Sequence, residues 1–233
     1  TPQGGPLSPL LSNIMLNELD KELERRGLPF VRYADDSMIF CKSKRAAMRV
    51  KESVTRFIEN ALYLKVNKEK TVVSYVRGVK YLGYSFYVMK GKCQLTVHPK
   101  SKAKMKSRLK ELTSRSNGWG YAKRKQKLKE YIKGWVGYYH LANMKRLLLE
   151  TDEWLRRRIR MCIWKSWKRV KTKVANLIRC GISKHKAYEW GNTRKGYWRI
   201  ADSYILHRAI TKEHLCRAGY ATLMGAYLEW YPK

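Results

Sequence analysis

A large excess of positive charge limits the conditions under which this chain can stay folded and the partners that it can bind. Its 233 residues carry 51 Lys and Arg against 18 Asp and Glu, so the formal charge is +33 at pH 7. A folded chain with this charge repels itself, and a bound polyanion is the usual compensation. Each phosphate that Lys or Arg contacts releases counterions, which favours nucleic acid as the partner. An anionic membrane would satisfy the same electrostatics, but a membrane-surface protein is expected to show a separable amphipathic segment beside a neutral body.

The composition excludes several other classes of protein. Hydrophobic residues make up 44% of the chain, which is enough for a core and argues against disorder. The apolar runs are short and broken by Lys or Arg, and no leader opens the sequence. We therefore expect a cytoplasmic, nucleic-acid-associated protein with no membrane partner. The five cysteines are odd in number and form no CxxC pair, which indicates neither a zinc ribbon nor a disulfide framework.

Two helices are predicted in the first hundred residues. Ser8 followed by proline is typical of a helix cap and first turn, and Leu residues at helical spacing follow as far as Leu23. Gly27 suits the position after the helix end. Ser43 is expected to cap the second helix, whose apolar stripe runs from Ala47 to Ile58.

Strands are predicted around these helices. The apolar runs at 30–33 and 38–41 flank Ala34-Asp35-Asp36-Ser37, which predicts a hairpin. Further strands are expected near residues 71–76, 81–88 and 94–97. The first hundred residues should therefore place two helices on an antiparallel sheet.

The character of the sequence changes at His98-Pro99. Residues 1–100 carry a net charge of +9, whereas residues 101–233 carry +24. Three amphipathic helices with basic outer faces are predicted between residues 102 and 168, which indicates a small bundle. Beyond residue 173 the sequence is basic, aromatic and expected to be helical.

Asp35 and Asp36 are adjacent carboxylates in the turn of an apolar hairpin. Aspartates are common in turns because they tolerate the geometry and bond their own backbone. Alternatively, the pair is a magnesium site, because Mg²⁺ is usually held by one or two carboxylates together with substrate phosphates.

Four short blocks occur in order along the chain. They are TPQGGPLSP at 1–9, YADD at 33–36, NKEKT at 67–71 and KYLGY at 80–84. In this order and spacing they resemble the later palm motifs of group II intron reverse transcriptases. The helices that follow are similar to the thumb, or domain X, of these maturases. The similarity extends through residues 190–200 and 205–209, which resemble the C-terminal segment of bacterial members.

The resemblance implies an α+β chain with three parts. A partial polymerase palm, an antiparallel sheet with two helices, is expected at residues 1–98. An α-helical thumb, or domain X, is expected at 99–173, and a basic helical C-terminal extension that binds nucleic acid at 174–233. The chain begins with Thr1 in place of Met, so we expect a C-terminal portion that lacks the fingers and the early palm.

Asp35 and Asp36 match the family's metal-binding aspartates, which implies two Mg²⁺ ions in the complete enzyme. In two-metal phosphoryl transfer, one ion activates the primer 3′ hydroxyl and the other steadies the triphosphate and the leaving pyrophosphate. The family also uses an aspartate from an earlier palm strand, which this chain does not supply. We therefore expect the isolated chain to be incompetent as a polymerase, and the complete protein to be active.

Nucleotide contacts are implied at two further places. Pro2, Gln3 and Gly4 match the loop beside the nascent base pair, where glycine lets the backbone approach nucleotide or template. An ordinary helix-entry loop is the alternative. Lys70 matches a catalytic lysine near the triphosphate, where it would neutralise charge or donate a proton to pyrophosphate. The alternative is an ordinary solvated lysine.

Primer and duplex contacts complete the implied site. Tyr81, Leu82 and Gly83 match the hairpin that supports the primer strand, and a plain sheet strand is the alternative. The basic helices would follow the backbone of an A-form duplex, which is contacted mainly through phosphates and 2′ hydroxyls. A solvated charged face is the alternative. The expected backbone contacts are Lys102, Lys104, Lys106, Arg108, Arg156, Arg157 and Arg160. Either base stacking or packing would suit Tyr121, Trp190, Tyr197 and Trp198.

The function implied is that of an RNA-directed DNA polymerase and intron-splicing maturase. Its partners would be group II intron RNA, an RNA template–DNA primer duplex, target DNA and deoxynucleoside triphosphates. A non-catalytic RNA-binding splicing factor that keeps the palm scaffold is the alternative. The sequence does not indicate which intron is bound or which oligomeric state is formed.

Overall fold

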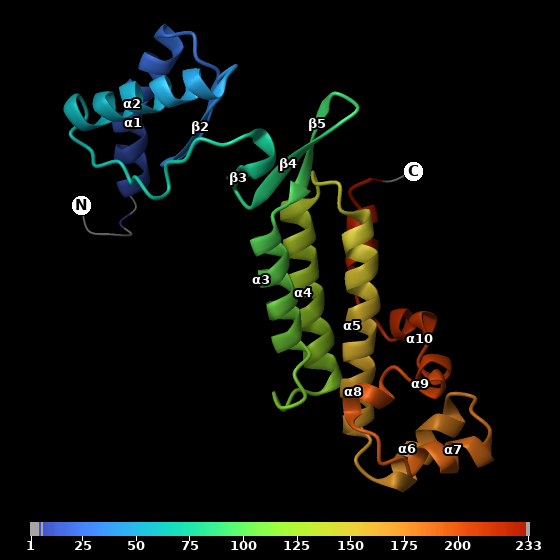
Figure 1. The fold of residues 1–233 in the computed structure, drawn as a ribbon. Helices are drawn as coiled ribbons and strands as arrows, with labels where there is room; N and C mark the ends of the chain where they lie inside the picture. Colours follow the sequence, from blue (N-terminus) through green and yellow to red (C-terminus); the bar gives the residue numbers. More distant parts are fainter. Residues whose placement is uncertain (1–4, 6, 232–233) are drawn as a thin grey trace. The chain divides into compact units, whose positions relative to one another are not determined.

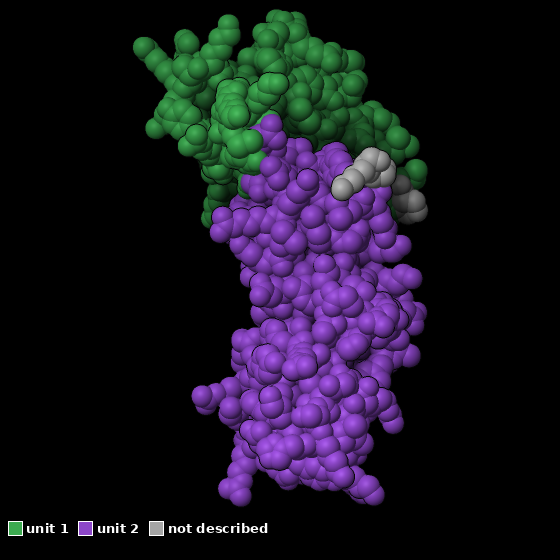
Figure 2. All heavy atoms as spheres, turned by 90° about the vertical axis from the view of Figure 1, so that its right-hand side faces the viewer, with its two compact units in different colours: residues 1–93 green, residues 94–233 purple. Residues whose placement is uncertain are grey.

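The computed structural model describes residue 5 and residues 7–231, and the chain forms two compact units, residues 1–93 and 94–233 (Figure 2). The boundary between the units falls within strand β5 (Lys92–Val97). The predicted domain boundary at residue 98 lies close to it, whereas the one at residue 173 falls inside the second unit. The division into three domains stays a prediction.

Helices α1 (Ser8–Arg25) and α2 (Lys44–Asn60) form most of the first unit (Figure 1). Their apolar stripes share a core in which Leu23 and Val54 are buried. Ser43 caps α2 as predicted, because its hydroxyl accepts a hydrogen bond from the Ala46 amide at 3.2 Å. The predicted Ser8 cap is wrong: α1 begins at Ser8 itself, and Leu7 occupies the cap position.

Strands β1 (Phe30–Tyr33) and β2 (Asp36–Ile39) form the predicted antiparallel hairpin. Phe30 pairs with Ile39, and both side chains pack against the core that α1 and α2 share. The hairpin is thereby attached to the helices at its open end. Its turn lies at the other end, where Tyr33 pairs with Asp36.

A three-stranded sheet follows in the order β3-β4-β5, with β3 (Lys80–Tyr81) antiparallel to β4 (Tyr84–Met89). The strand predicted at 71–76 is absent: residues 71–75 form no regular element, and a 3₁₀ turn, η1 (Val76–Gly78), follows. The β-branched residues here misled the prediction, because Val72 is 72% exposed and has no sheet to pack against.

Helices α3 (Pro99–Leu112), α4 (Tyr121–Tyr139) and α5 (Lys145–Ser166) form the predicted bundle in the second unit (Figure 1). Their facing stripes include Met105, Leu128 and Leu155, which are almost completely buried. In the part of the chain that the structure describes, none of the helices is both long and apolar enough to cross a bilayer.

Short helices follow the bundle and belong to the same unit. In the described residues they are α6 (Val170–Arg179), α7 (Lys184–Gly191), α8 (Tyr197–Ile200), α9 (Tyr204–Ala209), α10 (Lys212–Arg217) and α11 (Leu223–Leu228). The buried carboxylate of Asp152 on α5 accepts hydrogen bonds from the Leu223 and Met224 amides, at 2.8 and 2.9 Å. This carboxylate fixes the N-terminus of α11 against the bundle. The chain is thus α+β, with small sheets in a mainly helical molecule.

Candidate polymerase turn and nucleic-acid interface

The hairpin turn presents Asp35 and Asp36 to solvent. Ala34 precedes them with a φ of +53°, a left-handed conformation that is uncommon for a residue with a Cβ. Both carboxylates are exposed, and neither forms an ion pair among the described residues. Free carboxylate oxygens of this kind are the ligands that Mg²⁺ prefers. The donor chemistry therefore suits a hard cation, although no group of three or more His, Cys, Asp or Glu that could hold a metal forms among the described residues.

Arg32 fixes this turn to helix α1. Its guanidinium donates to both carboxylate oxygens of Asp20, with an Nε–Oδ1 distance of 2.8 Å. One further nitrogen donates to the Asn13 side chain and to the Ala34 carbonyl, both at 3.0 Å. The carbonyl that it holds belongs to the residue directly before Asp35. Arg32 thus positions the backbone from which the two carboxylates project.

Arg32 is a residue that the sequence motifs did not indicate, although a signal was present. Strand residues alternate between faces, so Arg32 lies on the same face as Phe30, which packs on the helices. A cation on that inward face needs a carboxylate partner. Asp20 follows the core residue Leu16 by one helical turn, which would have identified it as the partner.

The structure brings Tyr81 close to the aspartate turn. Burial raises the pKa of the Tyr81 phenol, the negative charge of Asp36 raises it further, and the positive charge of Arg32 lowers it. The hydroxyl is buried without a hydrogen-bond partner among the described residues. Positions 36 and 81, which are 45 residues apart in the sequence, therefore lie within electrostatic range of each other in the first unit.

Leu82 and Gly83 form the tight turn between β3 and β4, with φ values of +49° and +81°. The predicted hairpin at this motif is confirmed, whereas a continuous strand over 81–88 is not. Gly83 is required here because its φ lies in the region that glycine adopts without a steric penalty. The roles of Tyr81, Leu82 and Gly83 in primer binding stay a prediction.

Lys70 lies in an exposed turn. The Asn67 side chain accepts hydrogen bonds from the Glu69 and Lys70 amides, both at 3.1 Å, and so holds this turn. The Lys51 ammonium on α2 donates to the Thr71 carbonyl at 2.7 Å and ties the loop to the helix. The Lys70 ammonium has no partner among the described residues, and its contact with a triphosphate stays a prediction. Pro2, Gln3 and Gly4 lie outside the described residues.

The basic face of α3 is largely as predicted. Lys104 and Lys106 are exposed and without ion-pair partners among the described residues, while Lys102 is half-buried. Arg108 differs because it forms an ion pair with Glu111 at 2.6 Å on the same helix. The charge available for an anionic partner therefore centres on the lysines.

The prediction of an exposed basic face on α5 is wrong for Arg160. Its side chain is 5% exposed, and it donates to the Ile210 carbonyl at 2.9 Å. Burial lowers the pKa of this guanidinium, and the neighbouring charge of Arg156 lowers it further. The buried Arg160 side chain thus binds the C-terminal segment, and its guanidinium is not available to a phosphate.

Arg157 is half-buried and also contacts the C-terminal segment. It forms an ion pair with Asp202 at 2.9 Å and lies over the Trp198 ring, with Cζ 3.9 Å from the ring centroid. Arg156 is likewise half-buried. The C-terminal helices cover a side of α5 whose basic composition predicts a solvent-facing surface, because the sequence does not indicate where these helices pack.

Each of the two units contains a region that matches a known protein family. Residues 1–86 match the family of reverse transcriptases (RNA-dependent DNA polymerases), and residues 102–181 match the maturase-specific domain of group II introns. These two regions in this order are typical of group II intron reverse transcriptase/maturases. The resemblance that the sequence motifs indicated is confirmed: the chain is similar to proteins of that type.

Three relatives illustrate the similarity. Protein YkfC of Escherichia coli is 31% identical over 118 residues, with 36% of this chain and 31% of the relative covered. The group II intron-encoded protein LtrA of Lactococcus lactis is 28% identical over 153 residues, which cover 38% and 26% of the two chains. The retron Ec86 reverse transcriptase of E. coli is 32% identical over 77 residues, which cover 31% and 24%. The matched region thus spans less than a third of each relative's length.

Proposed function

We propose that this chain forms part of an RNA-directed DNA polymerase that also acts as the splicing maturase of a group II intron. The turn that presents Asp35 and Asp36 carries the proposal, because Arg32 holds its backbone from α1 and Tyr81 lies within electrostatic range of Asp36. Both carboxylates are free of ion pairs among the described residues and are open to solvent. Two free carboxylates on a fixed turn suit part of a site for metal-assisted nucleotidyl transfer.

Asp35 and Asp36 would hold the magnesium ions, two in the complete enzyme. When bound, these ions lower the pKa of the primer hydroxyl and neutralise charge on the triphosphate. The residues of this chain would position the primer strand through Tyr81, Leu82 and Gly83, and neutralise triphosphate charge through Lys70. Pro2, Gln3 and Gly4 would border the nascent pair. A third carboxylate is needed, so we propose that the 233-residue chain alone does not polymerise.

The second unit would hold nucleic acid through its uncompensated cations. Lys104 and Lys106 offer exposed ammonium groups along one helix, which suits contact with phosphates irrespective of base sequence. Intron RNA, the template–primer duplex and target DNA are the proposed partners, together with deoxynucleoside triphosphates. Such a protein would act in the bacterial cytoplasm, in association with nucleic acid.

The experiment compares wild type with Asp35→Asn/Asp36→Asn in the protein encoded by the intact reading frame. We expect primer extension to be lost while intron splicing persists, because Asn keeps the turn but removes the charge that binds Mg²⁺. Retained cDNA synthesis would contradict the catalytic assignment. Adding the 233-residue chain alone to primer and template should give no extension product.

One observation favours the second candidate function, a non-catalytic splicing factor on a palm scaffold. Only two neighbouring carboxylates gather at the turn, and no larger metal-binding group forms in the described part of the chain. This candidate requires that the wild-type encoded protein support splicing without any DNA synthesis. The same primer-extension assay therefore separates the two functions.

A further inference from the structure

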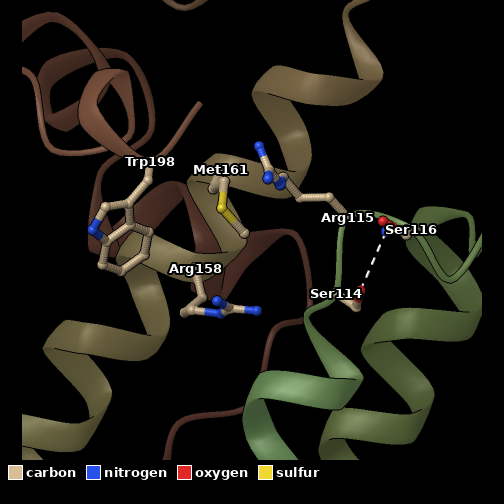
Figure 3. A pocket seen from close by; sticks show the side chains of 6 residues that line it. All are labelled: Ser114, Arg115, Ser116, Arg158, Met161 and Trp198. Atoms are coloured by element: carbon tan, nitrogen blue, oxygen red, sulfur yellow. Dashed lines mark hydrogen bonds between the residues drawn. The ribbon is translucent and has the colours of Figure 1, made fainter. Parts of the chain in front are cut away.

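A pocket of about 300 Å³ lies in the second unit, where the loop after α3 meets α5 and α8. Figure 3 shows Trp198 on one side, the Ser114–Ser116 loop on the other, and Arg158 and Met161 between them. Three segments far apart in the sequence build this pocket. Its volume lies at the lower end of the range for small-ligand sites.

The pocket carries positive charge that no acid neutralises. Arg115 and Arg158 form no ion pair with a carboxylate among the residues that the structure describes. Burial lowers the pKa of Arg158, and the neighbouring charge of Arg115 lowers it further. Arg124 and Lys165 also act electrostatically on the nearby Cys162 thiol, so four cations converge on this end of the bundle.

The guanidinium groups keep hydrogen-bond donors available. Arg158 donates through Nε to the Thr113 hydroxyl at 2.9 Å, and through Nη2 to the carbonyls of Lys110 and Thr113. These bonds hold the side chain rigidly, while its Nη1 has no acceptor among the described residues. Arg115 contacts the Tyr197 ring, 5.2 Å from its centroid, and no described carboxylate or carbonyl accepts from its guanidinium. An anion in the pocket would supply the missing acceptors.

An aromatic ring borders the same space and is held in place. Trp198 is 39% exposed, and Arg157 lies over its ring. Arg157 also donates to the Trp198 carbonyl at 3.1 Å and is itself paired with Asp202. A fixed, partly exposed indole beside unpaired guanidinium groups is the combination that binds a base and its phosphate together.

We propose that this pocket binds one unpaired nucleotide of an RNA strand, with the phosphate on Arg115 and Arg158 and the base against Trp198. The inference rests on the proposed function, which makes RNA the partner of this unit. A base inside a duplex is stacked and covers its faces, so only a base splayed out of the helix reaches an indole. The Ser114 and Ser116 hydroxyls line the pocket and are suited to hydrogen-bond with a ribose 2′ hydroxyl.

The test uses the full 233-residue chain and three probes: a fluorescently labelled non-self-complementary 12-nucleotide RNA, the single-stranded DNA of the same sequence, and a blunt-ended 12-base-pair duplex RNA. We expect Trp198→Ala to weaken binding of the single-stranded RNA at least about 5-fold, because stacking on one aromatic ring accounts for that much or more. Trp198→Phe should stay within about threefold of wild type, and binding of the duplex RNA should change less than about twofold with either substitution.

Arg115→Gln tests the phosphate contact. Removing one phosphate-binding cation should reduce the slope of log affinity against log salt by about 0.7 for the single strand. Tyr188→Ala, which removes an aromatic ring on α7 that is 53% exposed, is the control for Trp198→Ala and should leave affinity unchanged. In addition, 5-iodouridine in the wild-type complex should photocrosslink to Trp198.

The outcomes separate this inference from the proposed function. If Trp198→Ala binds single-stranded RNA as tightly as wild type does, or if the crosslinks form at residues other than Trp198, the proposed nucleotide pocket is wrong. RNA binding by the second unit would not be affected by that result. Equal or tighter binding of the DNA strand would overturn the assignment to RNA. Failure of wild type to bind any of the RNAs would overturn the proposed function itself. If Trp198→Ala does not fold, the wild-type crosslink and the salt slope of Arg115→Gln decide the question.

Discussion

Arg32 and Asp20 form a two-pronged ion pair that joins strand β1 to helix α1 within the first unit. Both side chains are mostly shielded from solvent, with exposed fractions of 13% and 20%. The same guanidinium holds the carbonyl of Ala34, the residue before the aspartate pair. Because an arginine fork is planar, one side chain fixes both the helix and the turn in a defined geometry.

Asp20→Asn should therefore destabilise the first unit by about 2 kcal/mol, since it leaves a largely shielded guanidinium without its charged acceptor. Urea unfolding followed through the amide NMR signals of β1 and β2 measures this. Glu18→Gln on the same helix is the matched control, because the Glu18–Lys21 pair is more than half exposed and should contribute under about 1 kcal/mol. Equal effects of the two changes would contradict a special role for Arg32–Asp20.

Tyr81→Phe should stabilise the first unit by about 1 kcal/mol. The Tyr81 hydroxyl is buried without a partner among the described residues, so removing it relieves a desolvation cost and sacrifices no hydrogen bond. Tyr227→Phe in the second unit is the contrasting variant, because the Tyr227 hydroxyl donates to the Ala142 carbonyl at 3.2 Å. That change should lower the free energy of unfolding by about 1 kcal/mol. Denaturant midpoints measured for each unit test whether stability rises in Tyr81→Phe and falls in Tyr227→Phe.

Glu22 should make the first unit sensitive to acid. Hydrogen bonds from Arg25 and then Arg26 lower the pKa of this carboxyl from 4.5 to about 2. A lowered pKa means that the unfolded chain takes up the proton first, so the stabilisation is present above pH 4.5 and is lost as the pH falls towards 2. Glu22→Gln should flatten the decline in stability between these values. Glu24→Gln, which removes an exposed carboxylate without an ion-pair partner among the described residues, should leave the decline steeper than Glu22→Gln does.

Arg160 and the α3 lysines should behave in opposite ways. Arg160→Gln is expected to lower the free energy of unfolding by about 2 kcal/mol, because the Ile210 carbonyl is deprived of its buried donor, and to leave the salt dependence of RNA binding unchanged. Lys104→Gln/Lys106→Gln should leave stability within about 0.5 kcal/mol and reduce the salt slope by nearly one unit for each phosphate that is no longer neutralised. Binding titrations at several salt concentrations and urea unfolding distinguish the two. A reduced salt slope for Arg160→Gln would show that its guanidinium reaches phosphate after all.

Sequence patterns correctly predicted the cap of α2, the hairpin turn and the amphipathic helices, because each of these depends on residues that are close together in the sequence. The YADD hairpin formed where two apolar runs flank a short polar turn, and Ser43 capped α2 as its position suggested. Gly27 adopted a φ of +62° after α1, as expected for a helix end. The three amphipathic helices of the bundle also formed, because an apolar stripe at helical spacing must be buried against another element.

Local rules failed where a distant segment decides the outcome. Residues 71–76 have strand-forming side chains, but no neighbouring strand pairs with them among the described residues. Arginine is usually a surface residue. Arg160 is nevertheless covered by the C-terminal segment, whose Ile210 carbonyl accepts a hydrogen bond from it. In both cases the missing information is which other part of the chain lies alongside.

The sequence by itself determined the charge, the order of the motifs and the faces of the helices, because these depend on composition and on spacing within one element. Only the tertiary structure decided that Tyr81 lies within electrostatic range of Asp36, that Arg32 holds the turn, and that Arg115, Arg158 and Trp198 share a pocket. Such contacts join residues separated by tens of positions, and backbone geometry alone allows many pairings between them. The burial of apolar faces selects one pairing, and this selection determines which cations are neutralised and which remain free to bind an anion.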